Sequence, residues 1–161
     1  METIYTKTIL YAYNHLEKVA EQIDELVNKK ALSSIDNCSP AIKQYDAIVQ
    51  LTYEKDVVYA LKKMCEKALS NFTEEEKRYF EYKYFRNKPK SYFEGFDTSS
   101  RAYFRKQNSL IKKCSDRFEK CGIDKSFFEE KCLTIDFFRQ LLKRTQEVEK
   151  KSYKNKPKMA K

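Results

Sequence analysis

Between positions 99 and 113, arginine, lysine, serine and asparagine side chains gather in a pattern that suits nucleic-acid recognition. They lie at and after the start of one expected helix, and two further lysines precede it. An arginine guanidinium can bind guanine through two hydrogen bonds, while lysine, serine and asparagine reach phosphates or base edges. The candidate DNA-binding residues are Lys88, Lys90, Ser99, Ser100, Arg101, Arg105, Lys106, Asn108, Lys112 and Lys113.

The charge around these residues favours a polyanionic partner. From position 83 to 113 there are 9 basic side chains against only Glu94 and Asp97, and the whole chain carries a net charge of +9. Residues 1–50 hold 5 basic and 7 acidic side chains, whereas the remainder holds 28 and 17. We therefore expect residues 1–50 to serve packing or partner binding, and the basic remainder of the chain to bind phosphates. The alternative is that the run 101–106 and the lysine-rich surface are only solvated faces.

The composition predicts an all-α protein, because 2 Gly and 3 Pro in 161 residues are too few for a fold rich in turns. Apolar spacing predicts helices over about 5–31, 40–70, 73–88, 100–119 and 135–149. In the first, Ile9, Leu16, Ile23 and Lys30 are seven apart, with Ala12, Val19 and Leu26 between them. Such a stripe suits a hairpin, a bundle or a coiled coil, and residues 9–27 are a candidate homodimer surface.

Three local signals mark helix ends. Ser39 followed by Pro40 suits the start of the second helix. Thr73 with Glu76 forms a capping-box pattern, and Gly122 stands where a left-handed C-terminal cap is needed. Aromatic residues at helical spacing are expected in the core rather than as base-stacking platforms: Tyr79, Phe80, Tyr84, Phe85, Phe96 and Tyr103.

The stretch 72–118 reads FTEEEKRYFEYKYFRNKPKSYFEGFDTSSRAYFRKQNSLIKKCSDRF. It resembles the helix-turn-helix of region 4 in sigma-70-type RNA polymerase factors, as found in small phage-type transcriptional regulators. Residues 72–76 and 83–85 match the opening of that pattern, and residues 99–106 match its second helix. This chain departs from the pattern at Phe93, at Gly95 and at Asp97, where the family usually has glycine.

The resemblance implies a regulator that binds double-stranded DNA through the second helix and can contact RNA polymerase. The expected organisation is a long N-terminal helical hairpin (1–70) for packing or dimerisation, a helix-turn-helix unit (72–121), a helical extension (123–149) and a basic disordered tail (150–161). Two alternatives stay open: a helical adaptor without sequence-specific DNA binding, and an RNA-binding protein.

Other function classes find no support in the sequence. The chain contains no glycine-rich phosphate loop, no nucleophile elbow and no HExxH motif, so we expect neither an enzyme nor a bound cofactor. Its five cysteines include no CxxC pair and lie far from the single histidine, His15, which favours free thiols over a metal site. Reduced thiols and the lack of a signal peptide or membrane span predict a soluble cytoplasmic protein.

Overall fold

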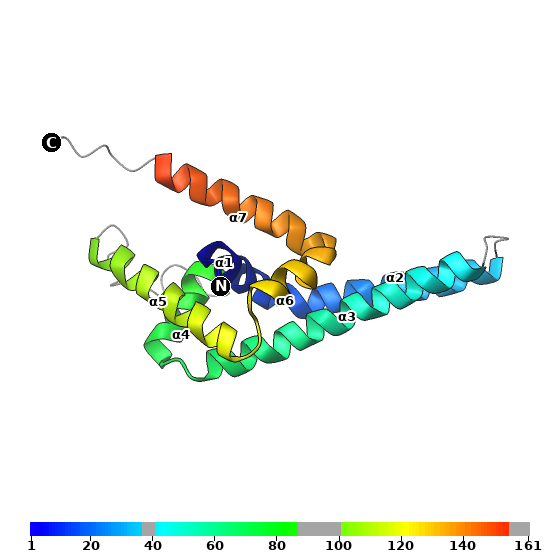
Figure 1. Cartoon of the computed structure of the whole chain (residues 1–161), viewed down its shortest axis with the longest axis horizontal. Coiled ribbons are helices and arrows are strands. Elements are labelled where there is room, and N and C mark those ends of the chain that lie inside the picture. The colour runs from blue at the N-terminus through cyan, green and yellow to red at the C-terminus, as the bar shows by residue number, and fades with distance from the viewer. Residues whose placement is uncertain (37–40, 87–100, 155–161) are drawn as a thin grey trace.

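The computed structural model describes residues 1–36, 41–86 and 101–154. These residues form helices joined by short turns and include no strand, which confirms the predicted all-α class (Figure 1). No helix in these ranges has the length and apolar character needed to cross a membrane. The elements in chain order are α1 (Thr3–Ala12), η1 (Tyr13–His15), α2 (Leu16–Asp36), α3 (Ala41–Ser70), α4 (Glu74–Phe80), η2 (Glu81–Phe85), α5 (Arg101–Lys120), α6 (Lys125–Glu130), η4 (Cys132–Thr134) and α7 (Asp136–Lys154).

The helices α2 and α3 lie side by side as a long antiparallel pair that projects from the rest of the molecule (Figure 1). Where the pair meets the body, its facing side chains are fully buried, among them Leu16, Val58 and Leu61. Farther along the pair, toward residues 36 and 41, the facing residues are only half-buried and the outer ones are exposed. Among the residues that the structure describes, none forms a third layer on the projecting end of the pair.

The first expected helix is interrupted by the 3₁₀ turn η1, and its two parts have different neighbours. Helix α1 packs against α5 and α7, whereas α2 packs against α3. The apolar positions from Ile9 to Ile23 are at most 6% exposed and belong to the chain's own core. Most of the candidate dimer surface at 9–27 is therefore occupied by intramolecular packing.

Helix α4 starts at the predicted capping box. The Glu76 amide donates to the Thr73 hydroxyl at 3.3 Å, and the Thr73 amide donates to the Glu76 carboxylate at 3.0 Å. After Phe80 the backbone widens into the π-helical turn η2, and it ends at Arg86 in the left-handed region with φ 52°. The helical structure ends at Phe85, before the Lys88-Pro89 step where the sequence predicted its end.

Helix α5 ends in the predicted glycine cap. Gly122 has φ 92°, its amide donates to the Glu119 carbonyl at 3.0 Å, and the Ile123 amide donates to Phe118 at 2.9 Å. This pair of bonds is a Schellman motif, and it satisfies carbonyls that the helix leaves open. The cap turns the chain so that Ile123 enters the core.

The C-terminal elements α6, η4 and α7 return the chain to α1. Phe128 and Phe138 are fully buried, and the Tyr5 ring stacks on Phe128 at 4.6 Å between centroids. An ion pair of 2.8 Å joins Lys7 on α1 to Glu149 on α7. Helix α7 continues to Lys154, so the first residues of the expected tail are helical, and the remainder of the tail lies outside the described residues.

Four described cysteines are free thiols, as the sequence predicted. Cys65, Cys114 and Cys132 are buried, whereas Cys121 is partly exposed. Burial raises the pKa of Cys114 and of Cys132 from 9.0 to about 12, and it raises that of Cys65 as well. Cys38 lies outside the described residues.

We expect iodoacetamide at pH 8 to label Cys121 at least tenfold faster than Cys65, Cys114 or Cys132. The reactive species is the thiolate, and a pKa near 12 leaves about one buried thiol in ten thousand ionised at that pH. Peptide-resolved mass spectrometry measures each rate, and the unfolded protein in urea is the control in which all four rates should converge.

The raised pKa values of Cys114 and Cys132 also mean that native stability decreases from about pH 9 to 12, because the unfolded thiols lose protons that the folded ones retain.

Candidate nucleic-acid interface

Helix α5 separates cleanly into a core face and a solvent face. Its core face is at most 8% exposed and consists of Tyr103, Gln107, Leu110, Ile111, Cys114, Ser115 and Phe118. These residues recur every three or four positions, which is the period of one side of an α-helix. The burial fixes the rotation of α5 about its axis, and this rotation decides which of the candidate DNA-binding residues face solvent.

Four candidate residues form one exposed line, which we name the α5 stripe: Arg101, Arg105, Asn108 and Lys112. Their spacings of four, three and four residues place them on one side of the helix, outside the core face. The α5 stripe begins at the first residue of the helix, and Figure 1 shows this end projecting away from the body. Three cations and an amide thus stand in a row that starts at the first residue of α5 and ends at Lys112.

The other two described candidates, Lys106 and Lys113, lie on the side of α5 that faces α4. Lys106 forms an ion pair with Glu75, and Lys113 forms one with Glu76 at 2.6 Å. Partial burial opposes ionisation of Glu76, but hydrogen bonds from Lys113 and from the Thr73 backbone give its carboxyl a lowered pKa. The capping-box carboxylates therefore also serve as counter-ions, and they hold these lysines against α4.

The aromatic ring of Phe72 reinforces the junction between α4 and α5. The Arg117 guanidinium lies 4.2 Å from its centroid and the Lys113 ammonium 5.3 Å away. Cations over an aromatic face are attracted by its quadrupole, and because Phe72 is only 4% exposed the attraction is larger here than at an exposed site. These contacts help to fix the orientation of α5 relative to the body.

Phe104 is a potential contact that the sequence analysis did not include among the site residues. It is 50% exposed and stands beside the α5 stripe, three residues after Arg101 and four before Asn108. An exposed apolar side chain here can contact the methyl group of thymine in a major groove. The sequence analysis assigned Tyr103 to the core and gave Phe104 no role, and the structure shows Tyr103 buried and Phe104 half exposed.

The remaining aromatic residues of the region belong to the core. Tyr79, Phe80, Tyr84 and Tyr103 are at most 8% exposed, and Phe85 is half-buried. Burial gives the Tyr79 and Tyr84 hydroxyls a pKa far above the usual range. These rings cannot stack on bases without unfolding, as expected from their spacing.

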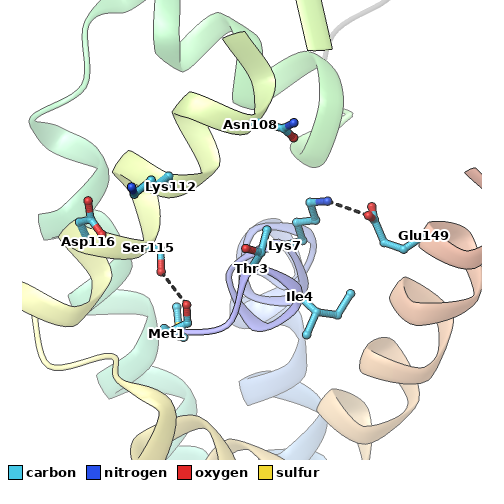
Figure 2. A pocket seen from close by; sticks show the side chains of 9 residues that line it. All are labelled: Met1, Thr3, Ile4, Lys7, Asn108, Lys112, Ser115, Asp116 and Glu149. Atoms are coloured by element: carbon cyan, nitrogen blue, oxygen red, sulfur yellow. Dashed lines mark hydrogen bonds and ion pairs between the residues drawn. The ribbon is translucent and has the colours of Figure 1, made fainter. Parts of the chain in front are cut away.

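A groove of about 740 Å³ adjoins the α5 stripe between α1, α5 and α7 (Figure 2). Asn108 and Lys112 contribute to its wall, and Lys7 reaches across from α1 to Glu149 (Figure 2). The Ser115 hydroxyl donates to the Met1 carbonyl at 3.1 Å and closes one end. The sequence analysis did not associate Lys7 with the site, because no local pattern brings residue 7 next to residue 112.

Several candidate residues lie outside the described part of the chain: Lys88, Lys90, Ser99, Ser100 and Phe96. The expected first helix of the helix-turn-helix lies in the same segment, 87–100. Within the described ranges, no three or more His, Cys, Asp or Glu side chains are placed to hold a metal ion. The exposed His15 lines a second hollow with Tyr11, Arg86 and Arg144.

Comparison of the chain with known protein families, with curated proteins and with solved structures finds no match.

Proposed function

We propose that this protein binds double-stranded DNA through the α5 stripe and acts as a transcription regulator. The observation that carries the proposal is the row formed by Arg101, Arg105, Asn108 and Lys112, all exposed along one side of a helix whose other side is buried. A single helix fits the major groove of B-form DNA, which is about 12 Å wide, and reads base edges from its N-terminal part.

The distribution of charge supports the same function. Lys106 and Lys113 are partly neutralised by α4, while the cations of the α5 stripe point away from that helix. Arginine at the helix start suits guanine recognition, and Lys112, about three turns later, suits a phosphate. The narrow, deep major groove of duplex RNA does not admit a helix in this way, which favours DNA as the ligand.

The resemblance of residues 72–118 to sigma region 4 adds RNA polymerase as a proposed partner. In this proposal the protein contacts polymerase while α5 occupies promoter DNA. The chain has no recognisable counterpart of the sigma module that melts the −10 element, so we propose a regulator and not a complete sigma factor.

The proposal predicts that Arg105→Ala weakens binding to a cognate duplex by about 1–3 kcal/mol, or roughly 5- to 150-fold, with little effect on random DNA. A base-reading arginine loses its hydrogen bonds only where the matching base is present. The cognate duplex would first be selected from genomic fragments at near-physiological salt. Fluorescence anisotropy with the selected and a scrambled duplex then gives both dissociation constants.

Lys106→Ala is the matched control, because it removes a neighbouring positive charge whose side chain is held by Glu75. We expect it to weaken binding less than Arg105→Ala on the selected duplex. Equal losses for Arg105→Ala on selected and scrambled DNA would exclude base readout by this residue. If all genomic fragments were recovered equally and this binding disappeared as the salt concentration increased, the protein would bind DNA only by electrostatic attraction.

A further inference from the structure

Helix α3 carries apolar residues on two opposite sides along the projecting end of the helical pair. One side faces α2 and includes Ile48, Leu51 and Val58. The opposite side holds a second line of large side chains, which we name the α3 stripe. It consists of Ile42, Tyr45, Val49 and Tyr53, which are 75%, 68%, 48% and 43% exposed. A helix that is apolar on both sides is suited to burial between two layers, and the described part of the chain supplies only one of them.

The exposed area of the α3 stripe matches the apolar part of a standard protein interface. With about 150–250 Å² for a whole aromatic side chain, the exposed parts of these four residues amount to roughly 400 Å². A standard interface buries about 800 Å² on each partner, a little over half of it apolar. One copy of the stripe therefore provides about the apolar area that one side of a stable interface requires.

The order of residues in the α3 stripe is nearly the same in both directions. Tyr45 lies one turn before Val49 and Tyr53 one turn after it, so the three form a ridge of residues four apart. Two such ridges interlock when helices cross at about −50°, the commonest packing between helices. Val49 is the smallest of the three and suits the crossing point, where the backbones are closest. A two-fold contact uses the same surface on both copies, so one ridge can supply both sides of it.

The residues beside the ridge also suit a second copy of the same surface. The exposed Asp46 lies beside it and offers carboxylate oxygens, whereas the half-buried Glu54 accepts a hydrogen bond from the Gln50 amide at 3.1 Å within the same helix. The tyrosine hydroxyls of a partner ridge can donate to such acceptors while their rings remain in the apolar contact. Each copy of the α3 stripe, with the residues beside it, thus supplies both hydrogen-bond donors and acceptors for contact with a second copy.

We propose that the α3 stripe is the contact surface of a homodimer in which two α3 helices cross at Val49. This surface is separate from the α5 stripe and does not depend on DNA binding. It also replaces residues 9–27 as the dimer surface, since Ile9, Leu16 and Ile23 are occupied within the chain.

Light scattering coupled to size-exclusion chromatography, in the absence of DNA, tests the proposal on the full chain. From about 1 to 100 µM the mass should rise from 19.3 kDa toward twice that value. Val49→Arg should raise the dissociation constant roughly a hundredfold, because a two-fold contact brings both new charges together. Gln50→Arg is the control, since it adds the same charge to the next exposed position and should leave the dimer intact.

A crosslinking measurement locates the crossing point independently. In a Cys38→Ser, Cys121→Ser background, which leaves only the three buried thiols among the described cysteines, Val49→Cys should form a disulfide-linked dimer under mild oxidation, and Gln50→Cys should form far less. Circular dichroism of each variant confirms folding, which the exposed positions should preserve. A mass of 19.3 kDa throughout, a dimer unaffected by Val49→Arg, or equal loss with Gln50→Arg would each overturn the proposal.

Discussion

Replacing Phe118 by alanine should lower the free energy of unfolding by about 3–5 kcal/mol. Phe118 is fully buried on the core face of α5, and its carbonyl accepts the 2.9 Å bond from Ile123 that completes the Schellman motif. Removing the ring loses the transfer free energy of an aromatic side chain and leaves a cavity that the neighbouring helices can fill only in part. Urea denaturation followed by circular dichroism measures the change.

Phe104→Ala is the matched control on the same helix. Phe104 is 50% exposed, so its truncation should change the free energy of unfolding by about 0.5 kcal/mol or less. The two substitutions delete the same atoms and differ only in the face of α5 on which they lie. Similar losses for both would mean that α5 is rotated about its axis, and the α5 stripe would then not be the exposed row.

Leu16→Ala should destabilise the protein by about 2–5 kcal/mol. Leu16 is the first residue of α2 and is fully buried where the helical pair joins the body. A cavity at this position weakens the attachment of both α2 and α3 to the core. The denaturation midpoint should therefore decrease in a single cooperative transition with an unchanged denaturant slope.

Leu26→Ala tests the same residue type ten positions later on α2. Leu26 is 47% exposed, and we expect its loss to cost under about 1 kcal/mol in the monomer. The comparison is made at low protein concentration, so that association between chains does not contribute. A cost for Leu26→Ala equal to that of Leu16→Ala would show that the core extends along the whole helical pair.

Local physics in the sequence was sufficient to predict the fold class and most helix limits. The scarcity of glycine and proline predicted an all-α chain, and the second helix, expected at about 40–70, is α3 at Ala41–Ser70. The Thr73 capping box and the Gly122 cap are both present, because each depends on backbone groups within a few residues of itself. The helix expected at about 100–119 is likewise present as α5 at Arg101–Lys120.

Only the tertiary structure decided which positions of the apolar stripe are buried and which charged side chains form ion pairs. The heptad-like stripe does not distinguish Leu16 from Leu26, yet Leu16 is fully buried and Leu26 is 47% exposed, because α5 and α7 pack against the α1 end of the stripe. Lys106 and Arg105 are neighbours in sequence, yet Glu75 on another helix binds Lys106. The groove between Lys7, Lys112 and Glu149 joins residues from both ends of the chain. Each of these outcomes depends on contacts between distant segments, and local periodicity contains no information about which segments meet.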